Sequence, residues 1–180
     1  MAILTAVDGD TVPCRATEQG YALAQECDEE LVVLHVMRQE KYDDLQDSID
    51  KGERANGGWG SSYPFQMEGP REITAERSRT SPSGGGSQFP IDDAEHWAEK
   101  VARRVVKETL GDYSDCEISY RGRVGDPVDA ILNEARKLDA EYIVIGGRKR
   151  TPVGKAVFGS RTQSILLNTD KPVVTVMREE

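Results

Sequence analysis

A basic segment between residues 146 and 169 has the residue types that are best suited to bind an anion. It holds no Asp or Glu, although the whole chain has a net charge of −9. Glycine lets backbone N–H groups approach an anion closely, and the start of a helix adds unpaired donors and a favourable dipole. The pattern therefore predicts a phosphate site from Gly146 to Ser160. The glycines that bracket it are Gly146, Gly147 and Gly159, and the cations of the segment are Arg148, Lys149, Arg150, Lys155 and Arg161.

The same residues also have an explanation that needs no ligand. Ser160 to Gln163 matches a capping box at the start of a helix, and Gly159 suits a tight turn. The cations also suit a solvated face that pairs with acidic neighbours. The segment has neither the Gly-Lys-Ser/Thr of a P-loop nor the GxGxxG of dinucleotide-binding folds. From the residues alone, both interpretations stay open.

The elements that position this segment alternate between strand and helix patterns. Apolar runs of strand length predict strands covered on both faces, and apolar residues at helical spacing predict the helices between them. This alternation predicts one α/β domain over 1–180, with an open five-stranded parallel sheet and helices on both faces. The first helix is expected to hold Pro13 in its first turn and to bury Ala16, Ala22 and Leu23. The predicted strands are 2–7, 30–37, 116–120, 141–145 and 172–177, and later helices begin near Asp92, Asp126 and Ser160.

Residues 38–90 interrupt the pattern after the second strand. Tyr42, Leu45 and Ile49 have the spacing of one or two helical turns, whereas 57–62 and 80–87 are rich in Gly and Ser, as linkers are. Loops of this length in compact domains are either disordered or functional. Two interpretations follow: a flexible insertion that the domain tolerates, and a lid over the carboxyl edge of the sheet.

Among single polar residues, Asp8 has the strongest functional claim. It follows the first strand, at the edge where open α/β sheets bind ligands, and its alternative is a turn or cap residue. His35 lies in an apolar strand, which favours a hydrogen-bonded core histidine, and His96 is expected to face solvent. Trp97 is expected in the core. Two histidines give no zinc spacing and no triad.

The amino-acid composition argues against some classes of binding partner. The chain has 32 acidic and 23 basic residues, and 15 of the cations are Arg and 8 are Lys. An acidic surface argues against nucleic-acid or anionic-membrane binding, and no run approaches the roughly 20 apolar residues of a membrane span. Without a signal peptide or a metal spacing among Cys14, Cys27 and Cys116, we expect a reduced, cytoplasmic protein. The lysine-poor acidity also suggests, as a hypothesis, a halophilic-type surface.

Several motifs of this chain resemble motifs of the universal stress protein family and occur in the same order. In that family the fourth strand ends in Gly-x2-Gly, and nine residues later Gly-Ser/Thr begins the last helix. Here Gly146 and Gly159-Ser160 match that pattern, and Lys149 stands at the second glycine position. The resemblance covers 1–37 and 91–178 and leaves the insertion unexplained. Its other motifs are Val7-Asp8-Gly9, Leu34-His35-Val36, Gly125-Asp126-Pro127, 139–146 and 171–176.

The resemblance implies a Rossmann-like sheet of the adenine-nucleotide α-hydrolase-like type, with strand order 3-2-1-4-5. It implies that ATP, ADP or AMP binds, with or without Mg²⁺, with Asp8 beside the base and ribose and Val36 against adenine. It also implies a homodimer through the last strand, Pro172 to Met177. The implied nucleotide-binding residues are Ala6, Val7, Asp8, Val36, Ile145, Gly146, Gly147, Arg148, Lys149, Gly159, Ser160 and Arg161.

Three functions fit these observations. The first, which we expect, is a nucleotide-binding stress or regulatory protein without efficient chemistry and without catalytic residues. The second is a slow ATPase or phosphotransferase, which would need Asp8 or Asp10 near Mg²⁺ and the γ-phosphate. The third is an interaction module without a ligand, in which Lys149 disables the loop and the insertion recruits a protein partner.

Overall fold

A computed structural model describes residues 1–50, 89–113, 116–148 and 159–178. Most of the predicted insertion and the loop that holds Lys149 lie outside these described residues. So do the side chains of Ile49 and Arg148.

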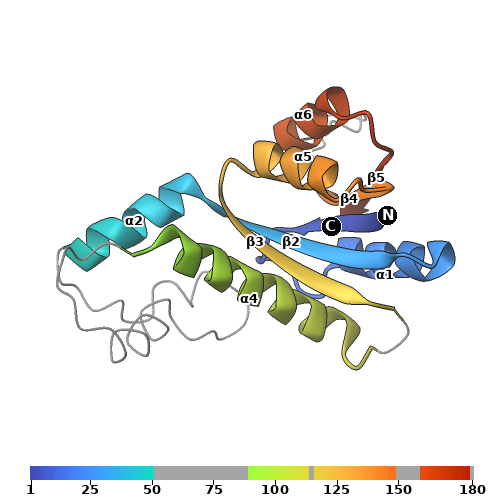
Figure 1. The fold of residues 1–180 in the computed structure, drawn as a ribbon, viewed down its shortest axis with the longest axis horizontal. Helices are drawn as coiled ribbons and strands as arrows, with labels where there is room; N and C mark the ends of the chain where they lie inside the picture. The colour runs from blue at the N-terminus through green and yellow to red at the C-terminus, as the bar shows by residue number, and fades with distance from the viewer. Residues whose placement is uncertain (51–88, 114–115, 149–158, 179–180) are drawn as a thin grey trace.

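Five parallel strands form one sheet in the order β3-β2-β1-β4-β5 (Figure 1), which confirms the predicted fold class and strand order. In the register, Val7 of β1 lies opposite His35 of β2, and Ala6 lies opposite Ile145 of β4. The chain order reverses between β1 and β4, so the carboxyl ends of these two strands form the switch point where such sheets bind ligands. The strands are β1 Ala2–Val7, β2 Glu30–Arg38, β3 Ile118–Gly125, β4 Tyr142–Arg148 and β5 Val173–Arg178.

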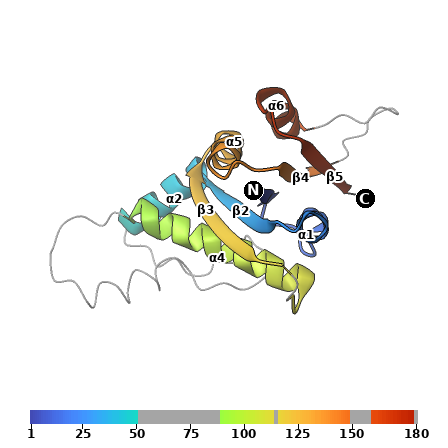
Figure 2. The same ribbon diagram turned by 45° about the vertical axis from the view of Figure 1, so that its right-hand side comes forward.

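Helices cover both faces of the sheet, as Figures 1 and 2 show. Helices α1 (Arg15–Cys27) and α4 (Ile91–Leu110) pack on one face, and α5 (Pro127–Lys137) and α6 (Ser160–Asn168) lie on the other. Each face has its own apolar core. The predicted core residue Trp97 is fully buried in the first, and Leu34 is fully buried in the second. A further helix, α2 (Gln39–Asp50), follows β2 directly.

Local capping explains where two of these helices begin and end. The Asp126 carboxylate accepts hydrogen bonds from the backbone N–H groups of Val128 (2.8 Å) and Asp129 (3.1 Å), which confirms the predicted N-cap before Pro127. Gly111 ends α4 with φ of 64°, a conformation that favours glycine. These signals are local, so the sequence carries them without tertiary information.

Several predicted details were wrong. Pro13 precedes α1, whose N-cap is Cys14, and Ala22 is exposed whereas Ala16 is buried. The third strand runs to Gly125, well beyond the predicted end at Tyr120. It continues through two arginines because they form ion pairs, described below, with the buried Glu134 of α5. Helix α2 is three turns long, more than the one or two expected.

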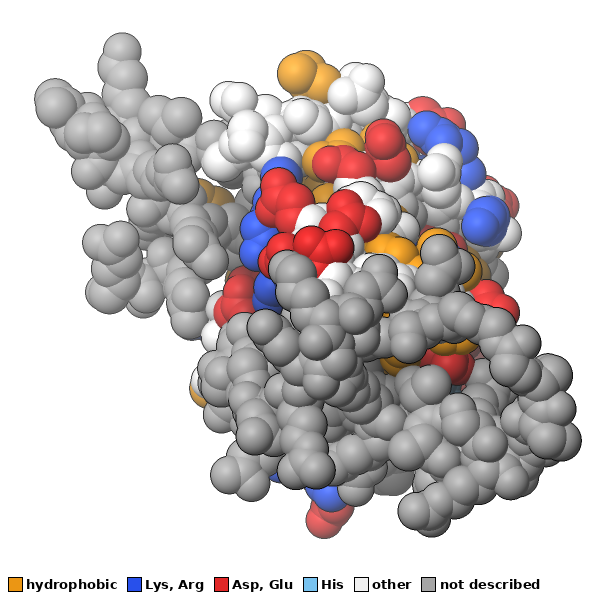
Figure 3. Space-filling model, turned by 90° about the vertical axis from the view of Figure 1, so that its left-hand side faces the viewer, with side chains coloured by type: hydrophobic (Ala, Val, Ile, Leu, Met, Phe, Trp, Pro, Cys, Tyr) orange, Lys and Arg blue, Asp and Glu red, His pale blue; other side chains and the backbone are white. Residues whose placement is uncertain are grey.

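The surface carries the negative charge that the composition predicts. Figure 3 views the molecule from the side where α2 lies in Figure 1, and acidic side chains gather on the described part of that face. Helix α2 contributes exposed Asp43, Asp44 and Asp47. Among the described helices, none combines the length and the apolar composition that crossing a membrane requires.

Candidate functional site

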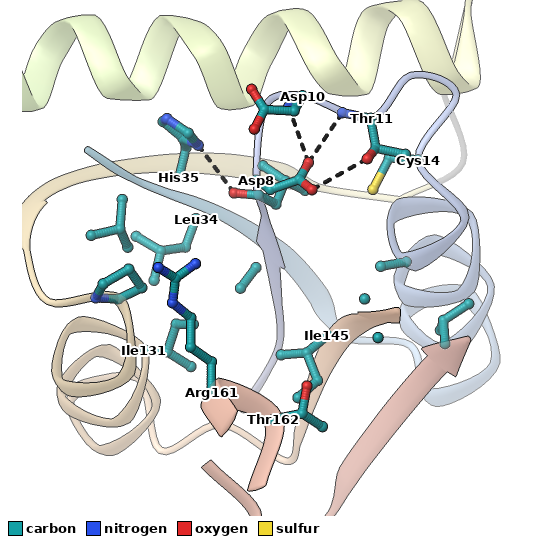
Figure 4. Close-up of a pocket in the computed structure, with 18 of the residues that line it drawn as sticks. Asp8, Asp10, Thr11, Cys14, Leu34, His35, Ile131, Ile145, Arg161 and Thr162 are labelled. Carbon is teal, nitrogen blue, oxygen red and sulfur yellow. Dashed lines mark hydrogen bonds between the residues drawn. The ribbon is translucent and has the colours of Figure 1, made fainter. Parts of the chain in front are cut away.

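A cavity of about 950 Å³ opens at the carboxyl edge of the sheet, where β1, β2 and β4 end. Its volume lies in the range of small-molecule pockets, about 300–1,000 Å³. The cavity also touches the first turns of α1 and α6, so it occupies the switch point described above. Figure 4 shows it with Asp8 on one side and Arg161 on the other.

The structure brings most of the predicted site residues to this cavity. Neighbouring parallel strands end at the same edge, so residues far apart in the chain meet there. The Arg148 side chain and Lys149 lie outside the described residues. The predicted residues that line the cavity are Ala6, Val7, Asp8, Val36, Ile145, Gly146, Gly147, Gly159, Ser160 and Arg161.

One wall of the cavity is apolar. Leu34 of β2 and Ile145 of β4, the strands on either side of β1, line the cavity and are almost fully buried, and Ile131 of α5 adds to the same wall. Figure 4 shows these three side chains below the turn that follows β1. A flat, apolar ligand surface such as a nucleobase would lose water from one face against this wall. Sequence analysis had not singled out Ile131.

The first turn of α6 supplies hydrogen-bond donors. Its N-cap is Gly159, and no side chain caps the helix. The predicted capping box is therefore wrong: Ser160 is the first helical residue, and its side chain is exposed. The first backbone N–H groups of a helix have no acceptor within it, and the helix dipole favours an anion beside them.

Thr162 adds a hydroxyl at the same helix end. Its exposed fraction is 6%, it lines the cavity, and it makes no hydrogen bond to the described residues. The hydroxyl can therefore donate a hydrogen bond to a ligand in the cavity. The sequence held no strong signal for Thr162 beyond its place two residues after Ser160.

At two cavity positions the packing of the described residues does not require a glycine. A Cβ built on Gly146 or Gly159 meets no described atom within 4 Å, and neither residue has a left-handed φ. At Gly20, by contrast, a Cβ would lie 2.0 Å from the Thr5 Oγ1, so that glycine is required for packing. Glycines that packing does not require, at a cavity, allow a ligand to approach the backbone closely.

Unpaired arginines give the cavity positive charge. Arg15, Arg38 and Arg161 line it, and none has a hydrogen bond or ion pair with the described residues. The other described arginine side chains have partners: Glu99, Glu108, Glu134, Glu95 and Asn133 engage Arg103, Arg104, Arg121, Arg123 and Arg136. Sequence analysis missed Arg15 and Arg38, since nothing local marks an arginine as facing a cavity.

Asp8 organises the turn after β1. Its Oδ1 accepts hydrogen bonds from the backbone N–H groups of Asp10 (3.0 Å) and Thr11 (3.1 Å), and its Oδ2 accepts one from the Thr11 hydroxyl (3.2 Å). This is the turn role that sequence analysis weighed as the alternative. Asp8 also lines the cavity, and its contact with base or ribose stays a prediction.

His35 is a buried histidine at the end of β2, as predicted. Its Nδ1–H donates a hydrogen bond to the Val7 carbonyl, 3.0 Å away, and thereby joins the ends of β1 and β2. Burial lowers the pKa of His35 to about 4, because the charged form loses its hydration, so the ring is neutral near pH 7. His96 is exposed, also as predicted.

The lowered pKa of His35 predicts a loss of stability in acid. The unfolded chain takes up a proton on this residue below about pH 6.5, whereas the folded chain resists protonation down to about pH 4. Between these values the free energy of unfolding should fall by about 3 kcal/mol from this residue alone. Urea unfolding at several pH values measures it. His35→Asn keeps a donor but does not titrate, so its pH slope should be shallower, and equal slopes would contradict the assignment.

Other chemistry finds little support in the described residues. No group of three or more His, Cys, Asp or Glu side chains in that part of the chain could hold a metal ion. Cys14, Cys27 and Cys116 form no disulfide.

Known proteins resemble this chain in sequence and fold. A model of the universal stress protein family matches residues 76–177. A universal stress protein of Mycolicibacterium smegmatis is 36% identical over 46% of this chain and 84% of that protein. The stress response protein NhaX of Bacillus subtilis is 35% identical over 42% of each chain, so this match spans less than half of NhaX.

Solved structures agree on the fold. A hypothetical protein from a structural genomics test case has a TM-score of 0.55 at 17% identity, covering 99% of this chain and 96% of that one. A universal stress protein in complex with cAMP has a TM-score of 0.50 at 15% identity, covering 98% and 96%. The family model and the M. smegmatis relative together show that this chain belongs to the universal stress protein family.

Proposed function

We propose that this protein binds an adenine nucleotide in the cavity at the carboxyl edge and acts as a cytoplasmic stress-response regulator without efficient catalysis. The base lies against the apolar wall of Leu34, Ile131 and Ile145, and the phosphates lie at the first turn of α6. The observation that carries the proposal is the start of α6, where an open glycine, free backbone donors and the Thr162 hydroxyl meet at one cavity.

The phosphate half of the site follows from elementary electrostatics. No described atom lies within 4 Å of a Cβ built on Gly159, and the Thr162 hydroxyl supplies a donor without a partner among the described residues. Arg15 and Arg38 bring unpaired positive charge to the same cavity in a chain whose net charge is −9. Hydrogen bonds to a charged phosphate are roughly twice as strong as neutral ones.

Adenine as the base is supported by the family. A universal stress protein with this fold has been solved with cAMP, which carries an adenine base. In this chain the apolar wall and the turn held by Asp8 and Thr11 form two further surfaces of the cavity. A purine against the wall would bury apolar area, worth about 25 cal/mol per Å².

A regulatory role without efficient catalysis fits the carboxylates of the cavity. Phosphoryl transfer needs carboxylates and Mg²⁺ placed at the γ-phosphate. Asp8, one of the cavity carboxylates, already accepts three hydrogen bonds from its own turn. Steady phosphate release that disappears in Asp8→Ala would contradict this part of the proposal and favour the slow ATPase.

The nucleotide proposal predicts that ATP stabilises the folded protein. At an ATP concentration 100 times the dissociation constant, with Mg²⁺ present, binding adds about 2.7 kcal/mol, which raises Tm by roughly 5–10 °C. Inorganic tripolyphosphate is the control for a site that recognises anions alone. The proposal fails if ATP leaves Tm unchanged, or if tripolyphosphate reproduces the whole shift.

We also propose a homodimer through β5, the described strand at one edge of the sheet. Val174 and Met177 of this strand are only half-buried, and Leu167 of the neighbouring α6 is 84% exposed. An edge strand has unpaired backbone groups that a second copy can pair with. Sedimentation velocity should find a dimer at micromolar concentration, and a monomer at all concentrations would contradict it.

A further inference from the structure

Arg161 occupies an electrostatically unfavourable position in the fold. It is the second residue of α6, where the helix dipole repels a cation. The described helices α1, α2, α4 and α5 each carry an acidic residue in the first turn, and α6 carries none. Arg161 also has no hydrogen bond or ion pair with the described residues, so its charge is available to a ligand in the cavity that it lines.

The direction of its side chain indicates which part of a ligand it meets. In Figure 4 Arg161 extends from α6 toward Leu34 and Ile131, the apolar wall, whereas the Thr162 side chain lies on the side of Ile145. The guanidinium therefore lies over the part of the apolar wall that Leu34 and Ile131 form. A base on the wall has one face against Leu34 and Ile131, and its other face needs cover.

We propose that Arg161 is a specificity-determining residue that stacks its guanidinium on the outer face of the nucleobase. The planar, weakly hydrated guanidinium stacks on aromatic rings, where Lys offers only a point charge. The base would then lie between the aliphatic wall and a planar cation, and aromatic bases would be selected over other groups of similar size. This inference rests on the proposed nucleotide site, because it assigns a role within it.

The test uses three probes to distinguish a contact of Arg161 with the base from a contact with the phosphates. Adenosine, ATP and inorganic tripolyphosphate are titrated into the full chain, into Arg161→Ala and into Arg161→Lys. A stacking role predicts that Arg161→Ala lowers the affinity for adenosine and for ATP by the same factor, about 3- to 30-fold. The affinity for tripolyphosphate should not change. Arg161→Lys should recover little of the loss, because it restores the charge without the plane.

A phosphate role would give the opposite pattern and overturn the inference. In that case Arg161→Ala would lower the affinity for ATP and tripolyphosphate but not for adenosine. Arg161→Lys would then restore much of the lost affinity. Unchanged affinity for all three probes would overturn it as well. Arg136→Ala is the matched control, since this exposed arginine of α5 bonds Asn133 and does not line the cavity. If the wild-type chain binds neither adenosine nor ATP, the proposed function itself fails, which is seen before any variant is compared.

Discussion

Replacing Gly159 with valine should weaken ATP binding by more than about 100-fold while the fold stays intact. The residue has φ of −63° and ψ of 153°, which valine adopts readily, and an added Cβ meets no described atom within 4 Å. The new side chain would stand where the phosphates approach the first turn of α6. Losing two hydrogen bonds to a charged group costs about 3–6 kcal/mol, and each 1.4 kcal/mol is a factor of ten.

The control for this change is a valine on the same helix that does not face the cavity. Gln163 is exposed and does not line it, so Gln163→Val should bind ATP as the wild type does. Isothermal titration gives the affinities, and circular dichroism should show a Tm within about 4 °C of the wild type for both variants, since valine is a poorer N-cap than glycine. Wild-type affinity in Gly159→Val would remove the first turn of α6 from the site.

Replacing Gly122 with alanine should have the converse effect, a large loss of stability with an intact site. A Cβ on this residue of β3 would lie 1.8 Å from the Glu95 carbonyl oxygen and 2.5 Å from the Glu99 backbone nitrogen of α4. These are backbone atoms, so α4 must move away from the sheet. Overpacking of this kind costs about 3 kcal/mol, which lowers Tm by roughly 6–12 °C in a chain of this size.

Gly159→Ala is the matched control, because it adds the same methyl group where there is open space. Urea unfolding should give it a free energy close to that of the wild type, while Gly122→Ala unfolds at a clearly lower urea concentration. Below its melting temperature, Gly122→Ala should bind ATP normally, since Gly122 does not line the cavity. Equal stability of the two variants would show that α4 and β3 are not in close contact.

The part of the fold that depends on local patterns could be predicted from the sequence. Continuous apolar runs such as 31–34 mark strands covered on both faces, and Asp126 before Pro127 marks a helix start. The strand order came from the family resemblance, and it then placed ten predicted residues around one cavity. Parallel strands that meet at one edge make such a site predictable once the order is known.

Features that depend on tertiary contacts could not be predicted. The third strand continues through Arg121 and Arg123, where its backbone pairs with β2 and Glu134 of α5 pairs with both side chains. Thr162 and Arg38 are site candidates only because the fold places them at the cavity. No spacing in the sequence indicates that either residue lines a cavity. Ser160 has the residue type of an N-cap, but α6 begins one residue earlier than the capping box predicts. Gly159 is the N-cap, and Ser160 is the first helical residue.

Isothermal titration of ATP with Mg²⁺ into the purified full chain, at high salt, tests the central proposal most directly. The proposal predicts one nucleotide bound per chain, and it predicts that Gly159→Val abolishes the heat of binding whereas Gln163→Val does not. No heat at several temperatures, with ADP and AMP as well as ATP, would contradict it. The chain would then be a universal stress protein that works without a nucleotide.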